Sequence, residues 1–177
     1  MVLYLFIEAF WLILPAYAGN SMAPLFKGTH PIDGGRKFRG RPLFGPGKTW
    51  EGFVFGCIIA TFIGFLQMAV MPNIPFATSP VPLLIVTMTP LLGFLLGFGA
   101  MFGDLVGSFI KRRMGIARGT PVPLLDQVDF LLGAFVFALI LVPIRWQWIL
   151  LMLILTPIFH LLANSVGYVL KLSKTWY

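Results

Sequence analysis

Long apolar stretches alternate with short polar ones along almost the whole chain. Five apolar stretches approach the length of about 20 residues that a transmembrane helix needs. They cover residues 1–19, 50–70, 82–110, 127–143 and 147–170. The sequence shows no internal repeat and no polar stretch long enough to form a soluble domain. The pattern therefore predicts an all-α, polytopic integral membrane protein with five transmembrane helices, in which residues 1–177 form a single transmembrane domain.

The third apolar stretch is too long for a straight crossing. About 29 residues at about 1.5 Å each would extend about 43 Å, against a hydrocarbon core of about 30 Å. We expect its last turns to tilt or to project into the cytoplasmic interface. That end carries Gly99, Gly103 and Gly107 at four-residue spacing, which would let a neighbouring helix approach closely.

Composition and charge agree with a membrane setting. The chain is 58% hydrophobic and 11% charged, with a mean hydropathy of +0.91, far outside the usage of soluble proteins. Its net charge of +7 comes from basic residues in the polar stretches, which suits anionic lipids and phosphorylated substrates better than nucleic acid. The single cysteine, Cys57, leaves no internal disulfide and no cysteine-based metal site.

The basic residues also predict the orientation in the membrane. The stretches richest in Lys and Arg, at about residues 20–49 and 111–126, should be cytoplasmic loops. The uncharged connection after the second span and the connection around Arg145 should lie outside, with Trp146 and Trp148 as interfacial anchors. This arrangement places the N-terminus outside and the C-terminus in the cytoplasm.

The first apolar stretch resembles a secretory signal in one respect. Residues 16–18, Ala-Tyr-Ala, look like a cleavage site, but no Lys or Arg precedes the stretch and Glu8 interrupts it. We therefore expect this stretch to be retained as a membrane helix. Glu8 should then be protonated or hydrogen-bonded to a neighbouring helix.

Three of the six acidic residues flank the second basic loop. Asp104, Ser108 and Lys111 share one helical face, and Asp126 and Asp129 share another. Antiparallel helices joined by this loop would bring the three carboxylates together at the membrane surface, where their repulsion must be neutralised by protons or cations. Hard oxygen ligands of this kind select Mg2+ together with substrate phosphates. The pattern therefore predicts a magnesium site.

Each carboxylate also has a structural interpretation. Asp126 could cap the fourth helix, and Asp104 could pair with Lys111 or Arg112 at the interface. Intramembrane carboxylates are costly, however, and basic residues accompany this group in the sequence. Taken together, the residues favour a functional site.

A second cluster, Gly-Pro-Gly-Lys-Thr-Trp-Glu-Gly at residues 45–52, leads into the second apolar stretch. It is not a P-loop, because the first glycine of that motif would fall at Pro42 and no strand precedes it. A glycine-rich turn that enters a helix still offers backbone N–H groups and a positive dipole end, to which Lys48 adds charge. The turn could bind a phosphate; alternatively, it only starts a helix and Lys48 reaches toward the lipid headgroups.

The other polar residues of the first loop are weaker candidates. Asn20, Ser21 and Asp33 could contact a nucleotide, or could belong to a basic loop that only fixes the topology. The two histidines, His30 and His160, lie far apart in the sequence and suggest neither a metal-ligand pair nor a catalytic triad.

These motifs resemble those of the integral-membrane CTP:phosphatidate cytidylyltransferases. The resemblance is carried by residues 103–105, 108–112 and 126–129, with 48–52 upstream. The chain departs from that family in its shorter length and in residues 121–125, which stand where the family has a His-Gly-Gly.

A closer resemblance, over nearly the whole chain, is to the archaeal branch of that group, the CDP-archaeol synthases. It is carried by Asn20-Ser21 and by residues 31–35, 47–52, 111–116 and 123–127. The resemblance implies five membrane helices with a cytoplasmic active site in the cell membrane. It also implies CTP and 2,3-bis-O-(geranylgeranyl)-sn-glycerol 1-phosphate as substrates. The metal-binding positions of the family fall at Asp104, Asp126 and Asp129.

On this hypothesis the lipid phosphate attacks the α-phosphorus of CTP and pyrophosphate leaves. Lys48, Lys111 and Arg112 would neutralise charge on the phosphates. The expected nucleotide contacts are Asn20, Ser21, Asp33, Lys48, Thr49 and Ser108. Catalysis would consist mainly of positioning and electrostatic stabilisation.

Two function classes compete with this hypothesis. A small ion-coupled membrane transporter would use the carboxylates as an ion pathway, but its charges should lie near the bilayer midplane rather than at span ends. A membrane scaffold would need no acidic cluster. CDP-alcohol phosphotransferases are disfavoured because their Asp-Gly-x-x-Ala-Arg motif is absent from the sequence. The sequence carries no signal for the oligomeric state.

Overall fold

The computed structural model describes residues 2–26, 28–74, 83–118, 120, 122 and 124–169. Five α-helices occur in these residues: α1 (Val2–Met22), α2 (Trp50–Val70), α3 (Pro90–Arg113), α4 (Leu125–Ala138) and α5 (Trp146–Val169). Short 3-10 turns, η1 (Ala23–Leu25) and η2 (Met71–Asn73), follow α1 and α2. The one sheet in the described chain is an antiparallel hairpin of β1 (Lys37–Phe38) and β2 (Arg41–Pro42). The prediction of a helical fold is confirmed.

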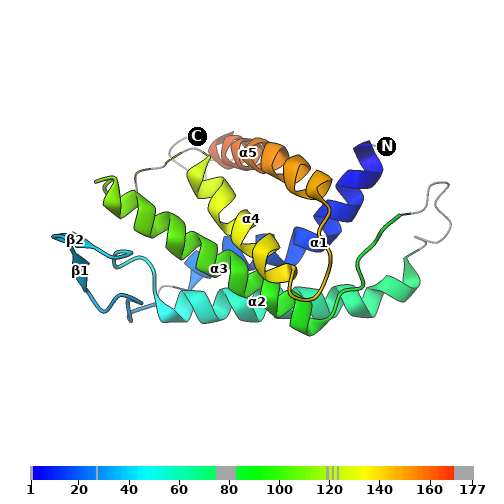
Figure 1. Ribbon diagram of the computed structural model, residues 1–177, viewed down its shortest axis with the longest axis horizontal. Coiled ribbons are helices and arrows are strands. Elements are labelled where there is room, and N and C mark those ends of the chain that lie inside the picture. Colours follow the sequence, from blue (N-terminus) through cyan, green and yellow to red (C-terminus); the bar gives the residue numbers. More distant parts are fainter. Residues whose placement is uncertain are drawn as a thin grey trace.

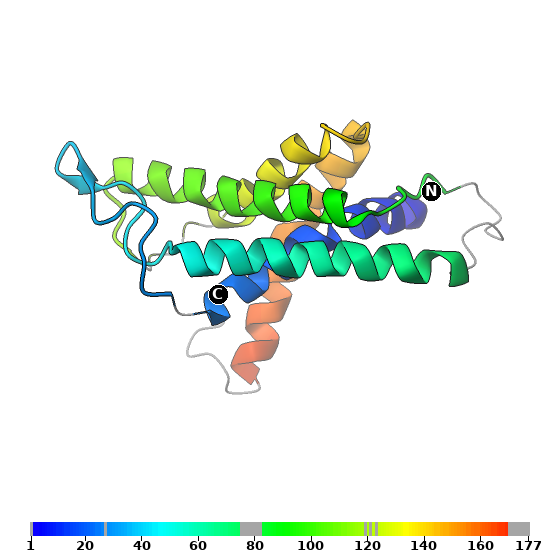
Figure 2. The same ribbon diagram turned by 90° about the horizontal axis from the view of Figure 1, so that it is seen from below.

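Helix α3 is the central element. It packs against α1, α2 and α4. Figure 1 shows α2 and α3 side by side along the longest axis, with α4 and α5 on one side of them. Figure 2 shows the hairpin β1–β2 at the same end of the molecule as the C-terminal end of α3. This end therefore combines the long first loop with the last turns of α3.

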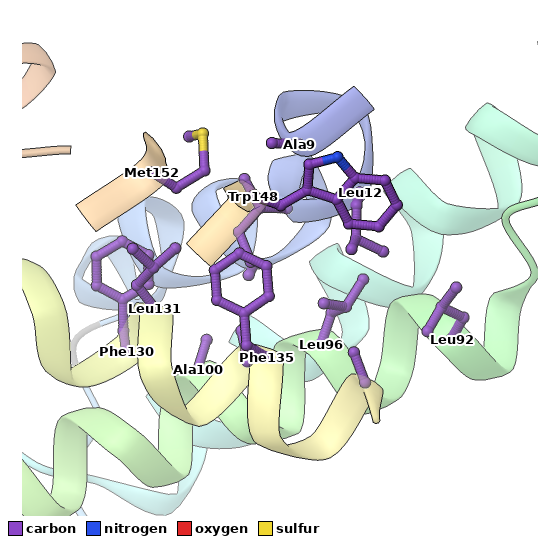
Figure 3. Packing of buried hydrophobic residues seen from close by; sticks show 14 of the residues in the cluster. Ala9, Leu12, Leu92, Leu96, Ala100, Phe130, Leu131, Phe135, Trp148 and Met152 are labelled. Atoms are coloured by element: carbon purple, nitrogen blue, oxygen red, sulfur yellow. The ribbon is translucent and has the colours of Figure 1, made fainter. Parts of the chain in front are cut away.

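The core lies between α1, α3, α4 and the first half of α5. Its fully buried side chains include Leu12, Leu96 and Phe135, which lie close together in Figure 3. Gly99, Gly103 and Gly107 of α3 face α4, as the spacing predicts: a Cβ at Gly99 would overlap the backbone of Gly133. Close backbone approach of this kind needs small residues on both helices.

Among the described residues, three helices are long and apolar enough to cross a membrane: α1 with η1, α2 with η2, and α3. On α2, large apolar side chains such as Val54, Ile58 and Phe62 are exposed on the outer face, as a lipid-facing helix requires. Helix α4 has 14 residues. At about 1.5 Å per residue it extends about 21 Å, less than the hydrocarbon core. Helix α5 has 24 residues, as many as α3.

The third apolar stretch differs from the prediction at its start. Helix α3 begins at Pro90, because the Thr89 hydroxyl accepts a hydrogen bond from the Leu92 N–H at 3.1 Å and proline is favoured at the first helical position. Residues 83–89 form neither helix nor strand. Part of the excess length is thus irregular chain, and α3 itself, with 24 residues, still extends about 36 Å, so the tilted or projecting end stays a prediction.

The fourth apolar stretch also forms less helix than predicted. Residues 127–143 were expected to be helical, but α4 ends at Ala138 and residues 139–145 form turns and irregular chain. Pro143 accounts for this, since proline disfavours helical conformation in the residue before it and cannot continue a helix itself.

A buried carboxylate joins three segments at the end of the bundle opposite the hairpin. Glu8 accepts hydrogen bonds from the Leu84 N–H at 2.8 Å, Trp148 Nε1 at 2.9 Å and Arg145 Nη1 at 3.4 Å. The expected hydrogen bonding of Glu8 to a neighbouring helix is confirmed. The expected interfacial role of Trp148 is wrong, because this side chain is buried as a partner of Glu8, whereas Trp146 is exposed.

Candidate functional site

A cavity of about 460 Å3 lies at the end of the bundle that carries the first loop. Its walls come from the end of α1, the first loop, the start of α2, the middle of α3 and the connection after α3. Four of the predicted site residues line it: Asn20, Lys48, Thr49 and Asp104. The fold therefore gathers polar candidates from α1, from the glycine-rich turn and from α3 around one space.

The glycine-rich turn places Lys48 and Thr49 at the start of α2. The Lys48 N–H donates to the Gly45 carbonyl at 3.1 Å, and the Thr49 hydroxyl caps α2 by accepting from the Gly52 N–H at 3.3 Å. The Lys48 ammonium forms an ion pair with Asp104 of α3. Lys48 thus extends toward Asp104 of α3 and not toward lipid headgroups.

Asp104 and Asp126 do not make the contacts that their purely structural interpretations predicted. Asp104 pairs with Lys48 instead of Lys111 or Arg112. Asp126 accepts from the Lys111 ammonium at 2.5 Å and from the Val122 N–H at 3.0 Å. It does not cap α4, because Leu124 occupies the N-cap position of that helix.

Asp129 is packed against α3 at Gly103 and Gly107. A Cβ at Gly107 would overlap the Asp129 carboxylate, so this approach requires glycine. One carboxylate oxygen of Asp129 accepts from the Phe130 N–H at 2.6 Å, and the other is buried without a hydrogen-bond partner. Asp129 also interacts electrostatically with Asp104 and Asp126.

Lysines neutralise two of the three carboxylates, Asp104 and Asp126. In the part of the chain that the structure describes, no three His, Cys, Asp or Glu side chains are arranged to hold a metal ion. A buried carboxylate oxygen without a partner is costly, and the charges of Asp104 and Asp126 act on the same group. Hard oxygen donors of this type fit Mg2+.

The remaining predicted residues lie away from the cavity. Ser21 is exposed and Ser108 is buried within α3. Arg112 donates to the Ile116 carbonyl at 2.6 Å, and Lys111 forms an ion pair with Asp126. None of these side chains lines the cavity.

Asp33 organises the first loop. It is buried and accepts three backbone hydrogen bonds, from Gly35 at 3.0 Å, Phe44 at 3.1 Å and Gly45 at 2.9 Å. Burial by itself raises the pKa of Asp33, but the backbone donors outweigh it and hold the pKa below its ordinary value. With its oxygens occupied in this way, Asp33 fixes the glycine-rich turn from outside the cavity.

Arg118 lines the cavity but is absent from the residues that the sequence nominates. Its guanidinium group packs against Gly47, where an added Cβ would lie 3.3 Å from Nε and Nη2. Within the described chain it forms no ion pair, whereas Lys48 is paired with Asp104. Its only sequence signal is membership of the second basic loop, which applies equally to its neighbours.

The two basic loops contact each other. Arg41 Nη1 donates to the Arg113 carbonyl at 2.6 Å, and Arg113 Nη2 donates to the Arg41 carbonyl at 3.2 Å. The Arg113 guanidinium also lies 5.4 Å from the centre of the Phe38 ring. The loops that the positive-inside rule assigns to one side of the membrane therefore meet at one end of the bundle.

Comparison with known proteins identifies relatives over nearly the full length. A family described as CarS-like, CDP-archaeol synthase, matches residues 2–177. The CDP-archaeol synthase of Methanocaldococcus jannaschii is 40% identical over 179 residues, which is 98% of each chain. The CDP-archaeol synthase of Thermococcus gammatolerans is 46% identical over 161 residues, which is 90% of each chain.

One solved structure is similar in both sequence and fold. It is described as an intramembrane enzyme for archaeal membrane lipid biosynthesis, with a TM-score of 0.75 and 34% identity over 90% of this chain and 94% of that chain. This similarity confirms the resemblance drawn from the motifs. The chain therefore belongs to the CarS-like family of CDP-archaeol synthases.

Proposed function

We propose that the polar cavity is where this lipid cytidylyltransferase brings CTP and its lipid phosphate together. A CDP-archaeol synthase transfers CMP from CTP to an archaeal ether lipid phosphate and releases pyrophosphate. The observation that carries the proposal is the meeting of Lys48, Asp104 and Arg118 in one cavity at the end of membrane-length helices. Such a position lets a soluble nucleotide react with a lipid headgroup. The transporter alternative is not favoured.

The chemistry needs positioning more than proton transfer. The lipid phosphate is already an anionic nucleophile near neutral pH, since its second pKa is about 6. None of the described residues that line the cavity is a histidine. Lys48 and Arg118 would stabilise the charge of the triphosphate, with Lys111 and Arg112 as further candidates, and Asn20 and Thr49 would orient the nucleotide.

Mg2+ would be held by Asp104, Asp126 and Asp129. When bound, the ion would neutralise and orient the triphosphate oxygens. The partnerless oxygen of Asp129 and its electrostatic interaction with the other two carboxylates support this assignment. In its absence, Lys48 and Lys111 provide the counter-charges.

We further propose a cell-membrane protein with five membrane helices, an outside N-terminus and a cytoplasmic cavity. The lipid substrate would be 2,3-bis-O-(geranylgeranyl)-sn-glycerol 1-phosphate. Support comes from the two basic loops, which lie together at the cavity end. Helices α4 and α5 would complete the five, with α4 too short to cross the whole core without the chain that follows it.

Incorporation of radiolabelled CTP into lipid by the purified protein tests the function. Labelled lipid should form with Mg2+ and the ether lipid phosphate, and EDTA should abolish it. Asp129→Asn should lower the rate by about a hundredfold or more if this residue holds the ion, whereas Glu8→Gln, at the opposite end, should be mild. A wild-type protein that labels no lipid phosphate would disprove the proposal.

The stereochemistry at phosphorus tests the direct attack. A chiral α-phosphorothioate analogue of CTP should react with inversion, because one in-line displacement inverts the centre. Retention would instead require a covalent nucleotidyl-enzyme and a nucleophilic side chain.

A further inference from the structure

The carboxylate of Glu51, in the first turn of α2, gathers the donors of a short neighbouring segment. It accepts from the Thr29 N–H at 3.0 Å and from the His30 N–H at 3.2 Å. His30 Nδ1 lies 2.6 Å from the same oxygen, and the Thr29 hydroxyl lies 3.3 Å from it. Because an ionised carboxylate only accepts, His30 carries its proton on Nδ1 in this contact. One side chain thus binds two consecutive residues through backbone and side chain.

The same segment runs beside the residues that carry the cavity's polar groups. The Trp50 N–H donates to the His30 carbonyl at 3.0 Å, and the Ile32 N–H donates to the Lys48 carbonyl at 2.8 Å. Pro31 and Thr49 form the bridge between these two hydrogen bonds. The backbone of residues 30–32 therefore pairs with the backbone of residues 48–50. Glu51, which follows the second segment, accepts from the His30 N–H at the end of this pairing.

Gly28 extends the segment into the cavity wall. It lines the cavity, whereas Glu51 does not. A Cβ at Gly28 would overlap both the Glu51 carboxylate and the Thr49 hydroxyl, so the cavity wall at Gly28 packs closely against the start of α2. Glu51 consequently touches the wall at Gly28 and the backbone of Thr29 and His30 without facing the cavity.

We propose that Glu51 is a positioning residue for the nucleotide: it holds the wall at Gly28 and the backbone of Lys48 and Thr49 in the arrangement that receives the phosphates. This inference rests on the function proposed for the cavity. The Glu51 side chain is 36% exposed, so its removal leaves no hole in the core. A role limited to global stability would not be expected from such a residue.

Kinetics of Glu51→Ala test the proposal. Loss of the charge-assisted hydrogen bonds should raise the KM for CTP, and the Kd for CTP in calorimetry, by about tenfold or more. The KM for the lipid phosphate and the melting temperature should stay close to those of the wild type. Glu51→Gln retains an acceptor oxygen for the two N–H groups and should restore most of the CTP affinity.

Two matched variants sharpen the comparison. His30→Ala leaves both backbone donors in place and should raise the KM for CTP less than Glu51→Ala does. Glu8→Gln changes a carboxylate that accepts three hydrogen bonds at the opposite end of the bundle, and it should leave the Kd for CTP unchanged.

An unchanged Kd for CTP in Glu51→Ala would overturn the positioning role. So would an equal rise in the KM values for CTP and lipid, or a fall in melting temperature that accounts for the whole effect. If the wild type binds CTP but forms no CDP-lipid, the proposed function fails, and the calorimetric comparison of Glu51→Ala with Glu51→Gln still decides the role of Glu51.

Discussion

At the residue scale, we expect the ion pair between Lys48 and Asp104 to couple the proposed binding of nucleotide and metal. Lys48 neutralises Asp104 in the structure, and Asp104 interacts with Asp129. Lys48→Gln should therefore weaken CTP binding by about tenfold, since a charge-assisted contact is lost. It should also let Mg2+ alone bind more tightly, because no ammonium has to be displaced. Calorimetry with CTP, and thermal melts with increasing Mg2+, measure the two effects.

Arg118 supplies the matched control. It lines the same cavity but has no acidic partner in the described residues. Arg118→Gln should weaken CTP binding in the same direction and leave the response to Mg2+ at the wild-type level. Identical Mg2+ responses in Lys48→Gln and Arg118→Gln would contradict the coupling through Asp104.

The first loop should be sensitive to acid through Asp33. Because the pKa of Asp33 is lowered in the folded protein, the ionised group stabilises the loop above its ordinary pKa of about 4 and loses this contribution as pH falls through the lower folded value. Hydrogen exchange at the amides of Phe44 and Gly45, corrected for intrinsic rates, should show protection that decreases on acidification. Asp33→Asn should be less protected at neutral pH and should lack the step. A step of the same size in Asp33→Asn would assign it to another group.

The sequence predicts residue identity better than residue partners. Lys48, Thr49 and Asp104 are found from a glycine-rich turn and from a carboxylate at a span end, and they line one cavity. Asp33 belongs to the same polar loop, but its oxygens are taken up by backbone donors, which no spacing rule reveals. Arg118 reaches the cavity because the two loops fold against each other, a tertiary contact without a local signature.

At the element scale, the contact between α3 and α4 determines where Asp129 lies. Gly107→Ala should push the Asp129 carboxylate away from α3, because the added Cβ would overlap it. Overpacking of this kind costs about 1–3 kcal/mol. We expect a lower melting temperature and a loss of activity that added Mg2+ does not restore. The measurements are thermal melts and the lipid-labelling assay.

A substitution on the outer face of the same helix provides the comparison. Val106 is exposed, so Val106→Ala shortens a side chain without disturbing the contact with α4. It should keep both the melting temperature and the activity. Wild-type activity in Gly107→Ala would show that the position of Asp129 does not matter for the reaction.

The boundaries of the elements show where hydropathy stops being informative. The second apolar stretch matches α2, whose start is marked by the Thr49 cap. In the third stretch the cap at Thr89 and Pro90 is readable in the sequence, but apolar residues on both sides of it hide the boundary. The residues before Pro90 are apolar because they pack against α1: Trp11 Nε1 donates to the Val86 carbonyl at 3.1 Å and Met88 is fully buried. Burial inside the bundle and exposure to lipid produce the same composition.

At the scale of the whole molecule, the contacts separate the two ends of the bundle. Glu8 joins the start of α1 to the segment before α3 and to the start of α5. At the other end, Arg41 and Arg113 join the two basic loops. The segment before α3 and the connection around Arg145 thus lie at the opposite end from the two basic loops, which is the segregation that the positive-inside rule requires of a single orientation.

Cysteine labelling in intact cells or sealed vesicles tests that orientation. Asn73→Cys, in η2 after the second span, should react with an impermeant thiol reagent added from outside, whereas Gly40→Cys, in the hairpin of the first loop, should react only after the membrane is opened. The native Cys57 is buried and should give little background. Because Gly40 has a positive φ of 77°, Arg36→Cys in the same loop serves as a second inside probe without a strained backbone. Labelling of both loop cysteines from outside, with Asn73→Cys protected, would reverse the orientation and place the cavity on the side of the membrane without cytosolic CTP.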